Sequence, residues 1–305
     1  MADSGVAALH RSILEWYSVH ARPLPWRDPS CSPWGVLLSE VMAQQTPLAR
    51  VEPAWREWID RWPTPADLAA ASPADVVRAW GRLGYPRRAL RLREAAIAIV
   101  DRHGGDVPRD QGELKALPGI GDYTAAAVAA FAFGDRSVVV DTNVRRVEAR
   151  VVTGVEHAAP SLTRAEVELA AALVPEDDKD AATWNVAVME LGALVCTARA
   201  PRCAECPVRE RCAWNVGGRP AYDGPPRRGQ KWHGTDRQVR GIIVQTLRDS
   251  LDPVARADLA SGRDAAQVDR CLAGLIEDGL VEPVGAERFS LPGHDQDDAV
   301  EEVAG

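Results

Sequence analysis

The sequence LPGIGDYTA at residues 117–125 predicts a tight turn between two helices. It lies between a helical stretch that ends near Leu117 and an alanine-rich segment, 123–133, with apolar residues at helical spacing. Gly119 and Gly121 allow a turn with positive φ, and they expose backbone N–H groups at the N-terminus of the second helix. Such a turn can bind a phosphate group. Since one Gly-x-Gly pattern also suits an ordinary connection between helices, the neighbouring motifs must decide.

A cysteine cluster follows about seventy residues later. Four of the six cysteines fall within seventeen residues, as Cys196-x6-Cys203-x2-Cys206-x5-Cys212, and Cys31 and Cys271 lie far away. The first residues lack a basic segment followed by an apolar run, so we expect a cytoplasmic chain, in which disulfides rarely persist. The cluster therefore indicates a metal-ligand set. Four thiolates suit both a [4Fe–4S] cluster and tetrahedral zinc, and the spacing leaves both open.

Composition indicates a globular protein with a sizeable core. The chain has 305 residues with 46% hydrophobic content, and no stretch approaches the length of a membrane span. The net charge of -8 argues against a nucleic-acid partner, but the basic and acidic residues are unevenly distributed, and the local charge matters more than the total. Between 199 and 240 there are ten Arg or Lys against four acids, whereas residues 292–305 carry five acids and no base. General abundance of arginine is the alternative explanation.

The order of segments predicts a mainly helical chain with a small C-terminal domain. Helical spacing recurs at 66–80, 89–102, 123–133 and 165–174, and residues 217–234 are rich in Gly, Pro and charge, as in a linker. After it come a helical segment (236–250), a short helix led by Pro253, a third helix (265–279) and two β-prone runs around a glycine. This order is typical of a winged helix. A generic helical cap is the alternative.

Several motifs occur in one order along the chain. They are LPWR (24–27), SEVMAQQT (39–46), GRLGY (81–85), LPGIGDYTA (117–125), VDTNVRRV (140–147) and MELGALVC (189–196) with its cysteine loop. Together they resemble the endonuclease III superfamily, and within it the MutY-type adenine DNA glycosylases, over about residues 24–214. The resemblance implies a two-lobed helix-hairpin-helix core and a [4Fe–4S] cluster, with zinc as the alternative. It also implies the following parts: an iron–sulfur lobe (1–30 and 142–216), a helical lobe with the hairpin (31–141), a linker (217–234), a winged-helix-like domain (235–291) and an acidic tail (292–305).

The resemblance also implies roles for particular residues. Glu40, in an apolar segment where burial would raise its pKa, is expected to protonate the adenine leaving group. Asp141, which also suits a helix N-cap, is expected to stabilise the positive charge that develops on the sugar, with Asn143 orienting the groups around it. Bifunctional relatives carry a lysine where this chain has Tyr123, so we expect base excision without efficient strand cleavage.

DNA contacts follow from the same resemblance. Gln45 and Tyr85 match wedge residues that fill the gap left by a flipped base, and Trp26 and Arg27 match positions that line the base pocket. The four cysteines are expected to bind the cluster, whose loop would present Arg199, Arg202, Arg209 and Arg211 to phosphates. We therefore expect a monomer that acts on double-stranded DNA with a mismatch or oxidised guanine, in the cytoplasm and at the nucleoid.

Some positions depart from the family pattern. Ala43 replaces a leucine, Pro86 replaces a second aromatic residue, and Val186 stands where many relatives contact the adenine edge with Gln or Glu. Well-known members carry a Nudix-like domain that inspects 8-oxoguanine, whereas the residues after the linker here are expected to form a winged helix. A thymine glycosylase of the same fold, active on T:G mismatches, is the nearest alternative. A non-catalytic, cluster-bearing DNA-binding regulator is another, although such a protein would need neither Glu40 nor Asp141.

Overall fold

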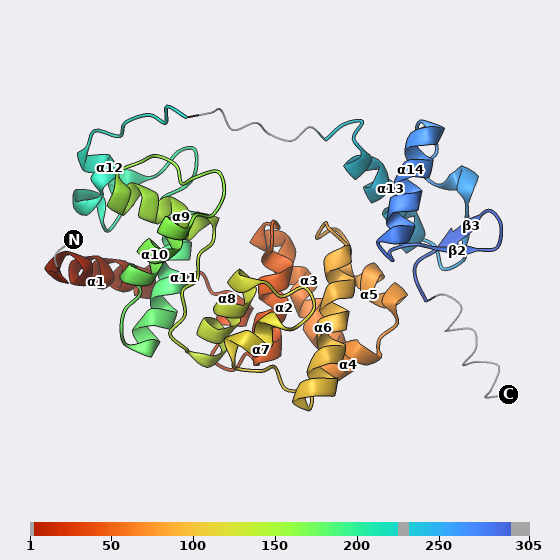
Figure 1. The fold of residues 1–305 in the computed structure, drawn as a ribbon, viewed down its shortest axis with the longest axis horizontal. Helices are drawn as coiled ribbons and strands as arrows, with labels where there is room; N and C mark the ends of the chain where they lie inside the picture. The colour runs from red at the N-terminus through yellow and green to blue at the C-terminus, as the bar shows by residue number, and fades with distance from the viewer. Residues whose placement is uncertain (1–2, 225–231, 294–305) are drawn as a thin grey trace. The chain divides into compact units, whose positions relative to one another are not determined.

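The computed structural model describes residues 3–224 and 232–293, and these residues are mainly helical, as predicted (Figure 1). The α-helices are α1 (Asp3–His20), α2 (Pro33–Ala43), α3 (Leu48–Arg61), α4 (Pro65–Ala70), α5 (Pro73–Trp80), α6 (Arg87–His103), α7 (Gln111–Lys115), α8 (Asp122–Phe133), α9 (Thr142–Glu148), α10 (Arg164–Leu173), α11 (Asp178–Leu194), α12 (Ala213–Val216), α13 (Asp236–Arg248) and α14 (Ala265–Glu277). Shorter helical turns are η1 (Pro25–Arg27), η2 (Ala149–Thr153), η3 (Cys203–Glu205), η4 (Arg209–Arg211) and η5 (Arg256–Asp258). The strands are β1 (Val254–Ala255), β2 (Glu282–Val284) and β3 (Arg288–Ser290). No helix in this described part is long and apolar enough to cross a membrane.

Capping residues set where the helices begin and break. The sequence predicts one helical stretch over 66–80, but the structure divides it into α4 and α5. The hydroxyl of Ser72 accepts a hydrogen bond from the backbone N–H of Asp75, and Pro73 lies in the first turn of α5. Proline lacks the N–H that would continue a preceding helix, and it disfavours helical dihedrals at the residue before it. The chain therefore turns between α4 and α5.

Two compact units make up the chain. The first comprises the described residues of 1–40, 108–116 and 120–226. Its core gathers side chains from α1, α9, α10 and α11, among them Ile13, Trp184 and Leu191. The segment that holds the cysteine cluster packs on this core through Val208 and Trp214. The domain boundaries expected from the sequence stay a prediction.

The second unit comprises the described residues of 41–107, 117–119 and 227–305. Here α6 packs against both α4 and α5. The C-terminal segment shares a hydrophobic core with these helices, because Val77 of α5 lies in one buried cluster with Val239 of α13 and Leu272 of α14. Leu90 of α6 packs against the same cluster.

The C-terminal segment has the order of elements of a winged helix. β3 pairs antiparallel with both β1 and β2, and Phe289 lies opposite Val254 on one side and Pro283 on the other. The short helix expected from Pro253 is reduced to the three-residue turn η5, since the chain first forms β1. The β-branched Val254 suits the extended backbone that pairs with β3. Residues 225–231 of the linker and 294–305 of the acidic tail lie outside the described residues.

Candidate active site

The hairpin between α7 and α8 uses its two glycines differently. Gly119 has a φ of 77°, and a Cβ added to it would lie 2.8 Å from the Cβ of Arg91, so both conformation and packing require glycine. Gly121 caps α8 in an extended conformation, with a φ of -100°. The positive φ expected there is therefore wrong. A Cβ on Gly121 would meet nothing within 4 Å, so the surrounding chain leaves open space at the start of α8.

Glu40 lies near the end of α2 and is 8% exposed, so it is buried, as the resemblance of its motif implies. The phenol oxygen of Tyr123, in the first turn of α8, donates a hydrogen bond of 2.9 Å to Oε2 of Glu40. Burial raises the pKa of Glu40 to about 7, with the hydrogen bond from Tyr123 acting against this and the charge of Asp141 adding to it. The carboxyl group can therefore carry a proton near neutral pH.

Tyr123 is itself largely buried. It packs against the small core formed by α8 and Val139, and burial, followed by the charges of Glu40 and Asp141, raises its pKa well above the usual value. The phenol therefore keeps its proton and serves as a hydrogen-bond donor. The sequence pattern did not reveal this contact, because 83 positions separate the two residues.

Asp141 caps α9 and also belongs to the buried carboxyl pair. Its Oδ1 accepts hydrogen bonds from the backbone N–H groups of Asn143 (2.8 Å) and Val144 (2.7 Å), and its Oδ2 accepts one from Nδ2 of Asn143 (2.7 Å). Burial raises the pKa of Asp141, and these three donors oppose the rise. The predicted N-cap is confirmed. Three donors fix both carboxylate oxygens in position.

Asn143 continues this network toward the cysteine loop. Its Oδ1 accepts a 2.7 Å hydrogen bond from Nη2 of Arg146, whose Nε donates to the backbone oxygen of Cys196 at 2.7 Å. Gly192 makes room for the contact, because a Cβ there would lie 2.7 Å from the Cβ of Asn143. Arg146 lies in the VDTNVRRV motif, but nothing in its residue type or spacing indicated these contacts.

The four clustered cysteines line one cavity. Cys196, Cys203, Cys206 and Cys212 face it together with Leu191, Val195, Arg209 and Trp214, among other residues. Burial, together with the neighbouring thiols, raises the pKa of Cys206 to about 11, so thiolates in this cavity need a positive partner. Across residues 3–224 and 232–293, no group of three or more His, Cys, Asp or Glu is arranged to hold a metal ion. The shared cavity and the donor chemistry nevertheless suit a group that binds through four thiolates.

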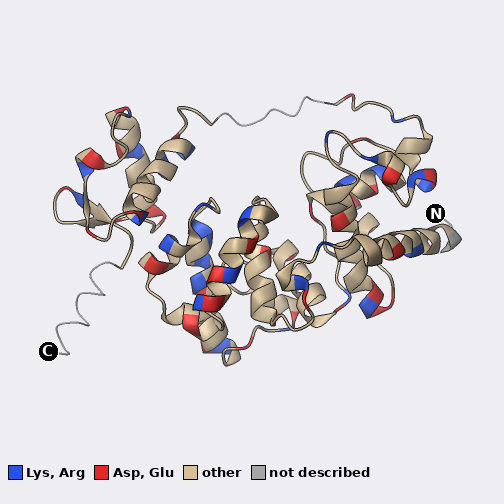
Figure 2. Ribbon diagram, turned by 180° about the vertical axis from the view of Figure 1, so that it is seen from behind, with Lys and Arg blue, Asp and Glu red and all other residues tan. Residues whose placement is uncertain are grey.

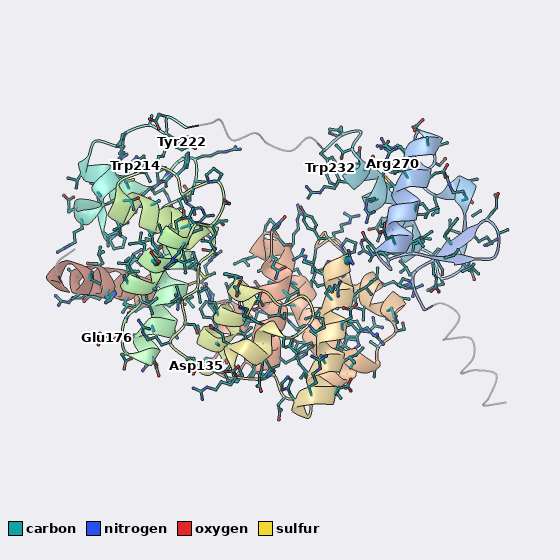
Figure 3. The ribbon with its side chains drawn as sticks, viewed as in Figure 1. Asp135, Glu176, Trp214, Tyr222, Trp232 and Arg270 are labelled. Carbon is teal, nitrogen blue, oxygen red and sulfur yellow. The ribbon has the colours of Figure 1, made fainter. Side chains whose placement is uncertain are left out.

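Arg150 holds the cysteine loop in place and was not singled out from the sequence. Its side chain is 1% exposed, and it donates hydrogen bonds to the backbone oxygens of Thr197 (2.8 Å) and Glu156 (2.9 Å). Nη1 also lies 3.4 Å from Sγ of Cys196. The guanidinium stacks on Trp214, labelled in Figure 3, at 4.9 Å from the ring centroid.

Trp26 and Arg27, in η1, lie beside a buried ion-pair cluster. Nη2 of Arg27 lies 2.9 Å from Oε2 of Glu190, and Arg22 bonds both oxygens of the same carboxylate at 2.7 Å. Burial alone would raise the pKa of Glu190, but the two arginines outweigh it and hold that pKa at about 2. The charge of Arg27 also reaches Glu40, whose pKa it lowers. Contact of Trp26 and Arg27 with a base stays a prediction.

In the second unit, Gln45 and Tyr85 share an unusual backbone conformation. Their φ angles are 53° and 49°, which side-chain-bearing residues rarely adopt. Such strain persists where surrounding contacts enforce it and is common at functional sites. Tyr85 lies in the loop 81–86 between α5 and α6, named here the Tyr85 loop, and is 43% exposed.

Arg88 ties the two strained segments together. Its Nη1 donates to the backbone oxygens of Val41 (2.7 Å) and Gln44 (2.8 Å), and its Nη2 donates to that of Gly84 (3.0 Å). Burial lowers the pKa of Arg88 to about 10, so it remains charged at neutral pH. One guanidinium therefore positions both predicted wedge residues. No sequence motif singled out Arg88 for this role.

The structure thus gathers Glu40, Tyr123, Asp141 and Asn143 within the first unit. The profile of the HhH-GPD superfamily of base excision DNA repair proteins matches residues 38–172, which include all four. An adenine DNA glycosylase of Mycobacterium tuberculosis is 53% identical over 285 residues, 92% of this chain and 93% of its own. The chain belongs to the HhH-GPD superfamily. The resemblance seen in the sequence is confirmed.

A second profile, the iron–sulfur binding domain of endonuclease III, matches residues 196–212. The match begins at Cys196 and ends at Cys212, and it confirms an iron–sulfur cofactor for this HhH-GPD protein. The zinc alternative finds no such support.

Thymine-specific members of the superfamily are similar over a smaller share of the chain. A thymine-DNA glycosylase of Aeropyrum pernix is 35% identical over 217 residues, 70% of this chain and 96% of its own. A solved structure of a thermostable thymine-DNA glycosylase matches with a TM-score of 0.63 at 26% identity, covering 70% of this chain and 98% of that one. The fold is therefore shared between enzymes named for different bases.

Proposed function

We propose that this protein is a monofunctional adenine DNA glycosylase. It removes adenine mispaired with 8-oxoguanine or guanine from double-stranded DNA by hydrolysing the N-glycosidic bond. The observation that carries the proposal is the buried Glu40, hydrogen-bonded to Tyr123 and coupled electrostatically to Asp141, in a chain 53% identical to an adenine DNA glycosylase.

Glu40 supplies the proton. With a pKa of about 7 it is partly protonated at neutral pH, and it transfers the proton to the adenine ring as the glycosidic bond breaks. Adenine then leaves as a neutral base. The carboxylate of Glu40 afterwards accepts a proton from the water that attacks the sugar, which restores the starting state.

Asp141 stabilises the sugar cation that forms when adenine departs. Its burial would favour the neutral acid, but the donors from Asn143 and Val144 favour the carboxylate. Two neighbouring carboxyl groups thereby take different roles, one as acid and one as anion.

Strand cleavage by a Schiff base requires an amine, and the residue at the hairpin position is the phenol of Tyr123. Nζ of Lys115, just before the hairpin, forms an ion pair with Asp122. The protein therefore releases the base without efficient cleavage of the strand.

DNA binding uses three kinds of contact. The open start of α8 at Gly121 presents backbone N–H groups to a phosphate. Gln45 and Tyr85 fill the space left by the flipped nucleotide. Arginines of the cysteine loop face the backbone, although Arg202 also donates to the backbone oxygen of Leu194 and lies 3.2 Å from Glu205.

The iron–sulfur cluster has a structural role. Cys196, Cys203, Cys206 and Cys212 supply its four thiolates, and Arg150 and Arg146 hold the loop by its backbone oxygens. We place this activity in the cytoplasm, at the nucleoid, in a monomeric protein.

Single-turnover base release tests the function. The duplexes carry adenine opposite 8-oxoguanine, adenine opposite guanine, and thymine opposite guanine, with and without alkali treatment. Adenine release that needs alkali to break the strand supports the proposal. If thymine is released and adenine is not, the protein instead has the activity for which the Aeropyrum relative is named. The Glu40→Gln variant, which cannot donate a carboxyl proton, should release neither base.

A further inference from the structure

Arg88 binds the peptide groups that directly precede the two strained residues. The backbone oxygen of Gln44, just before Gln45, accepts a hydrogen bond of 2.8 Å from its Nη1. That of Gly84, just before Tyr85, accepts one of 3.0 Å from its Nη2. The φ angle of a residue sets its rotation against the preceding planar peptide group, so a donor that orients this group also holds φ. Arg88 thereby acts directly on the two positive φ angles.

The same guanidinium also caps the end of α2, the helix that leads into Gln45. Nη1 of Arg88 donates to the backbone oxygen of Val41 at 2.7 Å. The last carbonyl groups of a helix have no partner within it, and a positive group suits them. The loss of Arg88 would therefore release the end of α2 and the Tyr85 loop together.

Buried neighbours brace this arrangement. Oγ1 of Thr46 donates to the backbone oxygen of Leu83 at 3.0 Å, which adds a second link between the segment after α2 and the Tyr85 loop. Nε1 of Trp80 donates to the backbone oxygen of Gly84 at 2.9 Å, and the guanidinium carbon of Arg88 lies 5.1 Å from the centroid of the Trp80 ring. Thr46 and Trp80 are both buried. The backbones of the two segments are thus held as one body.

The side chains of Gln45 and Tyr85 are exposed, in contrast to the contacts that hold their backbone. The guanidinium carbons of Arg88 and Arg237 lie 5.7 Å and 5.0 Å from the centroid of the Tyr85 ring. Exposed side chains on a fixed backbone lose less conformational freedom on binding than side chains on a mobile loop. Such a pair is suited to enter a base stack.

We propose that Arg88 is a positioning residue for the extrusion of adenine from the duplex. This inference rests on the proposed function, in which Gln45 and Tyr85 fill the space of the flipped nucleotide. Arg88 holds both residues in the conformation in which they enter the stack, so less conformational entropy is lost on insertion. The extruded adenine is thereby favoured over its return to the helix. The effect of Arg88 is on extrusion and not on bond cleavage.

The site requires a guanidinium and not only a positive charge. Nη1 and Nη2 of Arg88 bind oxygens of two segments at once, which the planar fork allows and the ammonium of a lysine does not reproduce. Burial lowers the pKa of Arg88 to about 10, and its Nε is buried without a hydrogen-bond partner in the part of the chain that the structure describes. A buried charge is unfavourable unless its hydrogen bonds compensate, so the contacts to the two segments carry the reason for keeping it.

Single-turnover excision by the full-length protein tests this role on two duplexes. Both carry adenine opposite 8-oxoguanine, but in the second the flanking base pairs are mismatched, so the adenine is poorly stacked and easier to extrude. Arg88→Met and Arg88→Lys should each slow release from the first duplex by about tenfold or more. On the second duplex the slowing should stay below about threefold, because extrusion there depends less on the wedge.

Fluorescence reports extrusion without base release. A 2-aminopurine placed beside the adenine loses a stacking neighbour when the adenine leaves the helix, and it becomes brighter. The protein carries Glu40→Gln in this measurement, so no base is released. Addition of Arg88→Lys to Glu40→Gln should reduce the rise in fluorescence to less than about half of that with Glu40→Gln alone.

Arg93 supplies a matched control on the same helix. Arginines recur along the first half of α6, and they are drawn blue in Figure 2. Nε of Arg93 donates to the backbone oxygen of Ala71 at 2.6 Å, so this guanidinium also ties α6 to a neighbouring segment, but to one without a wedge residue. Arg93→Lys should lower thermal stability as Arg88→Lys does, yet leave both excision rates within about twofold of the wild type.

Equal slowing on both duplexes would mean that Arg88 only supports the fold, and it would overturn the inference. Unchanged rates, or a full rise in fluorescence with Arg88→Lys, would overturn it as well. If Arg88→Met does not fold, Arg88→Lys decides alone. The proposed function is judged separately, since a wild type that releases adenine from neither duplex refutes excision, whereas the fluorescence still tests extrusion.

Discussion

The phenol oxygen of Tyr123 lies 2.9 Å from Oε2 of Glu40 and donates a hydrogen bond to it. Tyr123 therefore contacts the proposed proton donor directly. This hydrogen bond lowers the pKa of Glu40, whereas burial, the larger influence, raises it to about 7. The balance between them sets the pH at which adenine can be protonated.

Tyr123→Phe should move the pH dependence of excision. Without the phenol, burial and Asp141 raise the pKa of Glu40 above about 7, so activity should persist to higher pH than in the wild type, where it falls as pH rises through about 7. The rate at the optimum should fall by about tenfold at most. Single-turnover rates from pH 5 to 9, roughly two units either side of this pKa, measure both effects. Tyr222→Phe is the control, and an unshifted profile in Tyr123→Phe would disprove the role of the contact.

Tyr123→Lys should introduce strand cleavage. An amine at this position is next to Glu40, which can accept its proton and leave it nucleophilic toward the sugar carbon. Borohydride should then trap the variant on DNA, whereas the wild type should resist trapping. Arg263→Lys adds a lysine elsewhere and should not be trapped. Efficient trapping of the wild type would show that another amine, such as Lys115, performs the reaction.

Glu148→Gln should make stability less dependent on pH. Glu148 is 4% exposed, no group within residues 3–224 and 232–293 donates to its Oε2, and burial, with Glu166 and Asp141, raises its pKa to about 8. The folded state thus holds a proton that the unfolded state loses above about pH 4.5, so the free energy of unfolding falls as pH rises toward about 8. The raised pKa of Glu40 adds to this dependence of the free energy of unfolding on pH.

Denaturant unfolding at several pH values measures this slope. The Gln variant should be more stable than the wild type near pH 8, by an amount of order kcal/mol, and the difference should shrink toward pH 4.5. Glu168→Gln, which alters an exposed carboxylate, is the control. A slope identical in wild type and variant would show that Glu148 does not hold the proton.

Gly121→Ala should weaken DNA binding, whereas Gly119→Ala should lower the stability of the fold. The Cβ of an alanine at 121 would contact no other atom of the chain, and the φ of this residue is one that alanine readily adopts, so thermal stability should be nearly unchanged. The same Cβ would obstruct the phosphate and should weaken DNA binding. Alanine at 119 needs a positive φ and collides with Arg91, so it should cost about 1 kcal/mol or more of stability. Thermal unfolding and duplex binding distinguish them. Normal DNA affinity in Gly121→Ala would rule out close approach of the backbone.

Local patterns predicted most of the elements and the proposed chemical groups. Asp141 was expected as an N-cap from its residue type and its place before a helical run, and the structure confirms this. Glu40, by its position alone, suited an exposed helix face as well, and the resemblance of its motif favoured a buried acid; the structure buries it. Two predictions from local patterns were wrong. Pro73 breaks the helix expected over 66–80, and Val254 pairs in a strand where a helix was expected.

The order of motifs along the chain by itself determined the superfamily, because each motif depends on residue type and local spacing. Cysteine spacing alone left zinc open, and the resemblance favoured the iron–sulfur cluster and singled out Glu40 and Asp141 as the proposed carboxylates. Only the tertiary structure decided the contact of Tyr123 with Glu40, the hydrogen bonds from Arg88 to the backbone oxygens just before Gln45 and Tyr85, and the position of Arg237 at the Tyr85 ring. The physical reason is that hydrogen bonds, burial and stacking act over a few ångströms in space. Residues far apart in the chain meet only after the cores of the two units have packed.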